Sequence, residues 1–448
     1  MDHLLGACRH PRGDRHLTPL PRISERTARL LVEVSGQILD AQRPIRVLRL
    51  LSWPEDVERA FLDAGARDLP RPEYQIAPDV VDAGVRFRDL KNKVTGDNAI
   101  EAFLRDTCDA FATAARMLAA AGTRDFYHHS VELYGRPASL TADRRTTNLD
   151  LAQHFRRVVD GVAGRAPIPS PQDELVYTAE EVVPLLAQRF ARFFPDQSIR
   201  VELVDGIAAK AVAGVDAVRI KRGVRFSERD LAQLAFHEGQ VHVATALNGR
   251  AQPVMPFIGY PSPRTTGTQE GLAVLTEFLT QSTSIDRLRR LADRTLAIKM
   301  AEDGADFCQV YRFFLERDNN DRSAAYDSAR RVFRGGIVTG GAPFTKDVCY
   351  LDGLLRVTNF LRVALVKGNP GAAPLFFVGK ISVEDVPLFG RLVREGIVRA
   401  PEHLPAWARD LSYLTAFMSY AAFLNECDLD AESRVYDDLT SRAEDEMP

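Results

Sequence analysis

The feature that most constrains the fold of this chain is the segment HEGQVH, His237 to His242, within a helical pattern. Residues 227 to 230 are typical of a helix start and residues 248 to 249 of a helix end, so one helix is expected to carry the motif. On a regular α-helix, positions i and i+5 lie about 140° apart, which would separate the two imidazoles. A π-bulge, which widens one turn by a residue, brings them together and occurs preferentially at functional sites. The motif therefore predicts a locally widened helix.

Two histidines and a glutamate are the groups that a hydrolytic zinc site needs, with one coordination position left for water. His237 and His242 are the predicted ligands, and Glu238 is the predicted general base. Glu270, which lies 28 residues after His242 at the start of another predicted helix, is the expected third ligand. Glu277 competes for this role, but it lies two turns beyond Glu270, which favours either a solvated carboxylate or one that supports a ligand. One Zn²⁺ ion is the expected cofactor.

The HExxxH spacing also arises by chance, and a second string makes the assignment more specific. Residues 269 to 273 are QEGLA, and this string, with those at 248–253, 331–336 and 344–351, resembles the QEGLA-motif proteins. These are labelled in bacteria as flavohemoglobin expression-modulating, and their animal relatives are the microtubule-associated tyrosine carboxypeptidases. The resemblance extends from about residue 55 to residue 425.

This resemblance implies the same site: His237, His242 and Glu270 match the zinc ligands of the family, and Glu238 matches its general base. The family usually has HEIGTH, whereas residues 239 to 241 here are Gly-Gln-Val. Because none of these three is a ligand, metal binding is expected to be retained. The substrate preference is expected to differ.

A carboxypeptidase must hold the terminal carboxylate of its substrate, for which the planar, permanently charged arginine is well suited. The basic residues in or near the matching strings are Arg250, Arg264, Arg331, Arg334 and Lys346. Arg334 and Lys346 are preferred because they bracket a glycine-rich stretch, and Arg250 is kept as a further substrate-binding candidate. For each, the alternative is an ordinary surface or helix-pairing charge. Tyr350 is a candidate hydrogen-bond donor to an oxyanion, with a core tyrosine as the alternative.

Apolar periodicity predicts that most of the remaining chain is helical. The predicted helices are residues 24–41, 97–121, 148–162, 178–194, 268–281, 285–300, 305–315, 321–333, 346–366, 383–396 and 404–427. Alternating patterns at 200–204 and 211–222 predict two short strands joined by a turn, just before the motif. The expected fold class is α+β, mainly α: a zincin-like metallopeptidase with a small β-sheet beside the HExxxH helix.

Three regions are predicted: a disordered N-terminal tail at 1–22, an N-terminal helical region at 23–170 and a zinc metallopeptidase catalytic region at 171–448. The Pro-rich segment 166–172 marks the boundary. The net charge of -3, from 58 basic and 61 acidic residues, gives no global field that would gather nucleic acid. No nucleic acid or membrane partner is expected, and a cytoplasmic location is expected.

The expected function is a zinc-dependent metallocarboxypeptidase that removes a C-terminal residue from a peptide or protein tail. By resemblance that residue is tyrosine or another aromatic, but no basic tract resembles a microtubule-binding tail, so tubulin is not predicted. Two other classes stay open: a non-catalytic regulatory zinc protein, and an exopeptidase that acts at the N-terminus, because dipeptidyl peptidase III shares the HExxxH spacing. The sequence predicts no oligomeric state.

Overall fold

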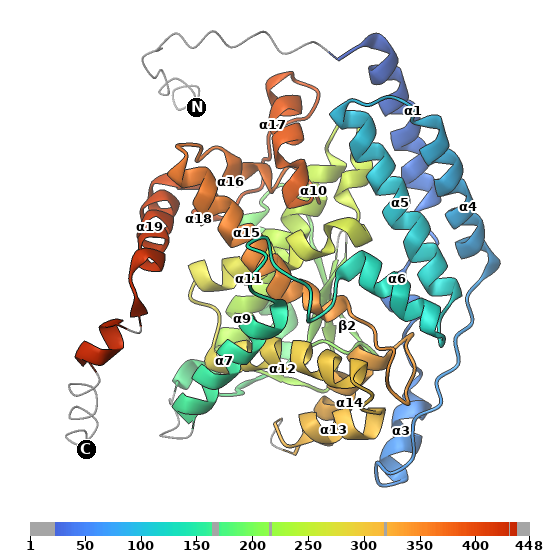
Figure 1. Cartoon of the computed structure of the whole chain (residues 1–448), viewed down its shortest axis with the longest axis vertical. Helices are drawn as coiled ribbons and strands as arrows, with labels where there is room; N and C mark the ends of the chain where they lie inside the picture. Colours follow the sequence, from blue (N-terminus) through green and yellow to red (C-terminus); the bar gives the residue numbers. More distant parts are fainter. Residues whose placement is uncertain (1–22, 164–169, 215–216, 318–319, 430, 437–448) are drawn as a thin grey trace.

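The computed structural model describes residues 23–163, 170–214, 217–317, 320–429 and 431–436, and these residues are mainly helical (Figure 1). The predicted tail at 1–22 and most of the predicted boundary at 166–172 lie outside them. In the part of the chain that is described, no helix combines the length and the apolar character needed to cross a membrane.

The N-terminal region forms one flank of the molecule, where α1 (Glu25–Ala41), α4 (Pro78–Lys93) and α5 (Ala99–Ala119) lie side by side (Figure 1). Their apolar faces meet in a buried core, in which the rings of Phe87 and Phe111 stack with centroids 4.8 Å apart. The sequence patterns missed four helices of this region: α2 (Val47–Leu50), α3 (Glu55–Asp63), α4 and α6 (Arg124–Tyr134).

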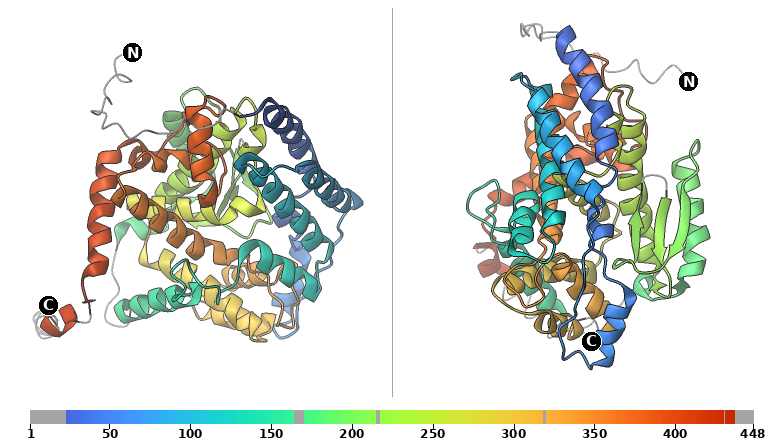
Figure 2. Two further views of the ribbon diagram at one scale, coloured as in Figure 1. Left: turned by 45° about the horizontal axis from the view of Figure 1, so that its top comes forward. Right: turned by 90° about the vertical axis from the view of Figure 1, so that its right-hand side faces the viewer.

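A small three-stranded sheet, β2 (Arg200–Val204), β3 (Ala211–Ala213) and β4 (Ala217–Lys221), stands at one side of the helical body (Figure 2). The order is β2-β4-β3, with β2 and β4 parallel and β3 and β4 antiparallel. The prediction of two strands joined by a turn is therefore wrong: the second pattern contains two strands, and the first pairs across the sheet with the last.

The sheet is held against the helix that precedes it in sequence. α8 (Ala179–Phe193) begins with a capping box at Thr178, as the sequence predicts, and packs on the strands through buried residues such as Val182 and Leu186. A two-stranded ribbon, β1 (Tyr177–Thr178) with β5 (Arg225–Phe226), joins the start of α8 to the start of the motif-bearing helix.

The HExxxH motif lies on one continuous helix, called the motif helix below. It consists of α9 (Glu228–Leu234), the π-helical segment η2 (Ala235–Val243) and α10 (Ala244–Arg250). The predicted widening is confirmed, and it extends over nine residues. Gly249 lies inside the last turn of the helix rather than after it. A Cβ there would lie 2.5 Å from the backbone of Gly259. Its small size serves packing.

The C-terminal half is a body of helices around α11 (Thr266–Leu279) and α15 (Cys349–Val366). These two helices cross in close contact: a Cβ on Gly271 would lie 2.0 Å from the carbonyl carbon of Gly353, and a Cβ on Gly353 would lie 1.9 Å from the Gly267 carbonyl oxygen. The other helices of this half are α12 (Ile285–Glu302), α13 (Phe307–Leu315), α14 (Arg322–Phe333), α16 (Ala372–Leu375), α17 (Val386–Arg394), α18 (Ala406–Arg409) and α19 (Leu411–Phe423). α7 (Asn148–Ala163), which precedes them in sequence, packs against α12.

Candidate metal centre

Three side chains from two helices converge on one point. His237 and His242 come from η2, and Glu270 comes from the second turn of α11. One oxygen of Glu270, Oε2, lies 3.6 Å from His237 Nε2 and 3.7 Å from His242 Nε2. All three donor atoms lie within 4.8 Å of one another. The structure thus brings together the three residues that the sequence selects as ligands.

The π-helical spacing is what turns both imidazoles to the same side. With the widened turn, the rings of His237 and His242 lie 4.9 Å apart at an interplanar angle of 82°. Gly239, between them, also has a packing role, because a Cβ there would lie 2.3 Å from the ring of Phe190 in α8. Gly239 therefore eases the distortion and also lets α8 approach the motif helix.

Glu277 supports His237 from behind. The Nδ1 atom of His237 lies 2.7 Å from Glu277 Oε1, and both oxygens of Glu277 accept hydrogen bonds from Arg287, at 2.9 and 3.0 Å. Glu277 is fully buried. A carboxylate on the far nitrogen of a ligand histidine fixes its tautomer and ring orientation, so that Nε2 faces the ion. Of the two roles expected for Glu277, a solvated carboxylate or one that supports a ligand, this geometry matches the second.

The charge state of His237 in the metal-free protein follows from these contacts. Burial disfavours its charged form, but hydrogen bonds with Glu270 and Glu277 and the charges of Glu238 and Glu277 outweigh burial and raise the pKa of His237 to about 10. A proton on His237 must leave before its nitrogen can bind an ion, so metal affinity is expected to fall as pH is lowered.

Glu238 lies beside the three donors and is held by the sheet. Its Oε2 atom accepts a hydrogen bond of 2.7 Å from the backbone N–H of Ala213 in β3, and its Oε1 atom lies 4.0 Å from His237 Nε2. One carboxylate oxygen is therefore fixed while the other faces the donor cluster. This is the geometry that a general base next to a metal requires.

Lys380 is a buried residue of this site that the sequence reasoning missed. Its Nζ donates to the His242 carbonyl, Thr245 Oγ1 and Gln269 Oε1, at 2.9, 3.1 and 3.1 Å. Burial lowers the pKa of Lys380 to about 7, although the charges of Glu270 and Glu238 raise it in part. Lys380 thereby links the motif helix, which carries the two histidines, to α11, which carries Glu270. Lys380 lies more than 100 residues from either helix in sequence, and no local pattern marks it.

A group of five cationic side chains lies around or near Tyr350. It comprises Arg287, Arg294, Arg331, Arg334 and Lys346, called the cationic cluster below. Three have a close carboxylate: Arg287 has Glu277, Arg331 has Asp347, and Lys346 has Glu270, whose Oε1 lies 3.2 Å from the lysine Nζ. Because Glu270 is also a candidate metal ligand, the cluster borders the metal centre.

Two guanidinium groups of the cationic cluster, those of Arg294 and Arg334, have no unshared carboxylate among the described residues. Arg294 lies 3.8 Å from Asp347, which already accepts two hydrogen bonds from Arg331. Arg334 packs over the ring of Phe344, and among the described residues its buried Nε has no hydrogen-bond partner. Burial and the nearby charge of Arg331 lower the pKa of both to about 10. The cluster therefore carries uncompensated positive charge.

Arg334 and Lys346, the pair preferred from the sequence, both belong to the cationic cluster, and Tyr350 lies beside Lys346. The Tyr350 hydroxyl accepts a hydrogen bond of 3.5 Å from Arg331. Arg264 is instead paired with Asp385, away from the cluster.

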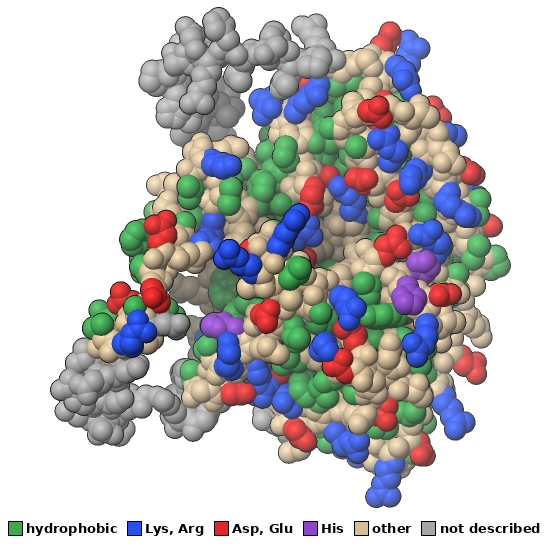
Figure 3. All heavy atoms as spheres, viewed as in Figure 1, with side chains coloured by type: hydrophobic (Ala, Val, Ile, Leu, Met, Phe, Trp, Pro, Cys, Tyr) green, Lys and Arg blue, Asp and Glu red, His purple; other side chains and the backbone are tan. Residues whose placement is uncertain are grey.

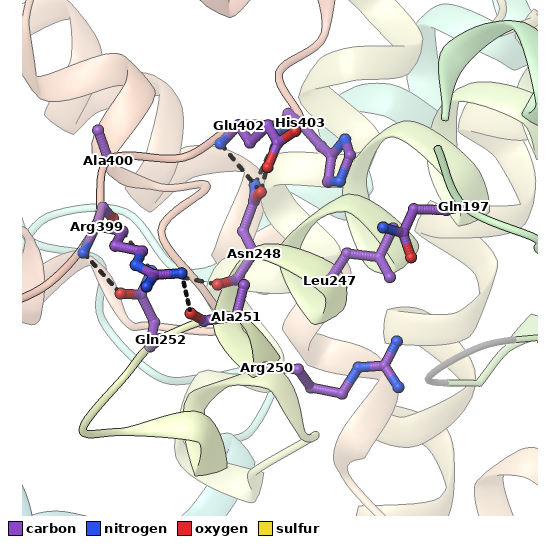
Figure 4. Close-up of a pocket in the computed structure, with 10 residues that line it drawn as sticks. All are labelled: Gln197, Leu247, Asn248, Arg250, Ala251, Gln252, Arg399, Ala400, Glu402 and His403. Carbon is purple, nitrogen blue, oxygen red and sulfur yellow. Dashed lines mark hydrogen bonds between the residues drawn. The ribbon is translucent and has the colours of Figure 1, made fainter. Parts of the chain in front are cut away.

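Arg250 lies in a different place. With Arg399, Glu402 and His403 it lines a cavity of about 320 Å³ at the end of α10, where its guanidinium points away from Arg399 (Figure 4). Within the described residues, no hydrogen bond or ion pair joins Arg250 to the metal donors. A role for Arg250 in holding the substrate stays a prediction.

The donor set fits a zinc ion. Donor atoms about 2 Å from a zinc ion are separated by roughly 3.3 Å in a tetrahedral site. The two His–Glu separations are 3.6 and 3.7 Å, and all three donor atoms lie within 4.8 Å of one another. Two imidazoles and a carboxylate leave one position free, which is the pattern of catalytic rather than structural zinc.

Comparisons with known proteins give a family. A family model described as microtubule-associated tyrosine carboxypeptidase matches residues 59–426. Among solved structures, the M32 carboxypeptidase from Deinococcus radiodurans R1 is similar with a TM-score of 0.44 and 14% sequence identity, over 88% of this chain and 99% of that chain. This second similarity is too distant to carry an argument about the reaction. No curated protein sequence gives a significant match.

Proposed function

Because the chain belongs to the family of the microtubule-associated tyrosine carboxypeptidases, we propose that it is a zinc-dependent carboxypeptidase acting on a peptide or protein tail. The observation that carries this proposal is the convergence of His237, His242 and Glu270 within 4.8 Å, with the carboxylate of Glu238 beside them. The edge strand β3, which lies against η2, supports a zincin-like arrangement of sheet and motif helix.

In the proposed reaction, Glu238 takes a proton from the attacking water and later gives it to the leaving amine. The Ala213 N–H holds one oxygen of Glu238, so the other is the one that moves the proton. When bound, zinc supplies Lewis-acid polarisation of the carbonyl and lowers the pKa of water toward about 7. Tyr350 is the proposed hydrogen-bond donor to the developing oxyanion.

The cationic cluster supports action at the C-terminus of the substrate. A terminal carboxylate needs a fixed positive partner, and Arg334 has a buried guanidinium that lacks an ion pair among the described residues. Arg334 and Lys346 are therefore the proposed carboxylate-binding pair, with Arg294 beside them. An N-terminal exopeptidase would instead need carboxylates to hold an ammonium group, and a surplus of cations disfavours that alternative. The proposed residue removed is tyrosine or another aromatic.

The decisive variant is Glu238→Gln, which keeps the shape of the side chain and removes its basicity. Hydrolysis by the zinc-loaded variant is expected to fall about 10²- to 10⁴-fold, while zinc stays bound at one ion per chain because Glu238 is not a ligand. Activity is measured by mass spectrometry on a peptide library, and zinc by elemental analysis. A variant as active as the wild type would rule out this mechanism.

Blocked peptides test the direction of cleavage. Amidation of the C-terminus is expected to stop hydrolysis, and N-terminal acetylation is expected to leave it unchanged. The reverse result would indicate an N-terminal exopeptidase. Stoichiometric zinc without cleavage of any library peptide would indicate a regulatory zinc protein.

A further inference from the structure

The helix α19 lies at one edge of the molecule, where no described element covers its outer side (Figure 1 and the left view of Figure 2). Its inner side is packed against the protein: Leu414 and Met418 are fully buried, and α15 and α18 are its neighbours. The outer side therefore belongs to the surface of a single chain.

The outer side of α19 is aromatic. Four aromatic residues of α19 and the leucine that follows the helix form this side, called the aromatic face below: Tyr413, Phe417, Tyr420, Phe423 and Leu424, which are 41% to 63% exposed. The first three are spaced by four and three residues, which places them on one side of a helix, and the rings of Tyr413 and Phe417 stack 6.3 Å apart. Figure 3 shows hydrophobic side chains at the left edge, where α19 lies.

Charge is missing from α19 as well. None of the residues from Leu411 to Phe423 is Asp, Glu, Lys or Arg. An uncharged, largely apolar helix is normally covered on most of its surface, yet within the described chain only the side of α19 with Leu414 and Met418 is covered. Apolar surface continues beyond the helix in Leu429, Val435 and Tyr436, which are 52% to 75% exposed.

The exposed area of the aromatic face is large enough to form the central part of a protein–protein interface. An aromatic side chain contributes roughly 150–250 Å² when fully buried, so four half-exposed aromatics present about 400 Å². That is about half of what each partner contributes to a standard interface, near 800 Å². It also matches the size at which an apolar patch on a monomer marks an interaction site.

A second copy of this chain is the occupant that fits best. An uncharged aromatic face is complementary to itself, and a two-fold axis brings the same patch of two copies together. If the two α19 helices run antiparallel, the basic Arg409 before one helix faces the acidic Glu426 after the other. The chain's own segment 437–448 is rich in Asp and Glu, which makes it a poor cover for apolar rings.

We propose that the aromatic face of α19 is a self-association surface through which two copies of this chain form an antiparallel, two-fold dimer. The proposal is independent of the reaction proposed above, since it uses no residue of the metal centre.

Sedimentation velocity of the full chain over a dilution series tests the proposal. The wild type is expected to be a dimer that dissociates on dilution, and Phe417→Glu and Tyr420→Glu are each expected to raise the dimer dissociation constant about 30-fold or more. Val81→Glu is the matched control, because Val81 is an apolar residue of α4 that is 48% exposed. Circular dichroism checks that every variant is folded.

The antiparallel arrangement has its own test. Glu426→Arg is expected to weaken the dimer, and the double variant with Arg409→Glu is expected to restore it. A wild type that is monomeric at every concentration would overturn the proposal, as would a Phe417→Glu variant that stays dimeric. Dimers that appear only after deletion of residues 1–22 would also overturn it, by assigning the face to the chain's own N-terminal segment.

Discussion

At the scale of single residues, the contact between Glu277 and His237 makes the first prediction. Glu277→Gln leaves the ligands in place but weakens the hold on the His237 ring, so zinc affinity is expected to fall about 10- to 100-fold. Competition with a chromophoric chelator measures this. Asp293→Asn is the control, because Asp293 is another buried carboxylate, paired with Arg156. Equal affinities in Glu277→Gln and the wild type would remove the supporting role.

The buried ion pair of Asp347 and Arg331 makes a prediction about acid stability. Burial raises the pKa of Asp347, but the charges of Arg331, Arg294 and Lys346 outweigh burial and hold it well below its ordinary value. A carboxyl group with a lowered pKa contributes stability above its unfolded pKa of about 3.9, which is lost as pH falls further. Urea unfolding of the wild type is therefore expected to show a decline below about pH 4.

Asp347→Asn is expected to lower the free energy of unfolding at neutral pH by about 3–5 kcal/mol, because it leaves Arg331 buried without a partner. The decline of stability below about pH 4 is expected to be smaller in this variant than in the wild type. Asp109→Asn is the matched control, since Asp109 forms an exposed pair with Lys91 and exposed pairs contribute about 1 kcal/mol or less. The same loss in both variants would contradict this account.

The site residues that could be predicted from the sequence are those that belong to a short motif with a characteristic spacing. His237, Glu238 and His242 lie in one motif, and Glu270 lies in a string recognisable by resemblance. Lys380 was missed because tertiary folding alone brings it to η2. Arg294 was missed for the same reason: nothing in the sequence of α12 distinguishes a guanidinium that will be buried next to Tyr350 from one that will face water.

At the scale of elements, the crossing of α11 and α15 makes a prediction about the metal centre. Gly353→Ala forces apart two helices that touch through backbone, which is expected to cost about 1–3 kcal/mol or more and to displace Glu270. Gly36→Ala is the matched control in α1, where a Cβ meets nothing within 4 Å, and a gain of about 0.5–1 kcal/mol is expected. Zinc titration and urea unfolding measure both effects. Unchanged zinc affinity in Gly353→Ala would contradict this coupling.

Elements with a strong helical period were predicted well, and the widened motif helix followed from the i to i+5 spacing alone. The pairing of the strands was not predicted, because an alternating pattern indicates a strand but not the strand next to it. The parallel pairing of β2 with β4 depends on contacts made only after folding. α4 was missed although Pro78 at its first position is a start signal. Its polar composition weakens the apolar period.

At the scale of the whole molecule, the metal centre joins the motif helix to the C-terminal helical body. Zinc at 100 times its dissociation constant is therefore expected to stabilise the fold by about 2.7 kcal/mol. Thermal or urea unfolding with zinc and with a chelator measures the difference. His242→Ala is expected to abolish it, and an equal stabilisation of that variant would show that zinc binds elsewhere.

The π-helical segment also has a consequence for descent. The widened segment holds one residue more than a regular turn, so deleting one residue between His237 and His242 would restore the i to i+4 spacing and leave α10 in place. Asn248 would keep the carbonyls of Phe377 and His403, to which its side chain donates at 2.8 and 2.9 Å. A lineage could therefore pass between HExxxH and HExxH by a single deletion or insertion, and remote relatives are to be sought with both spacings.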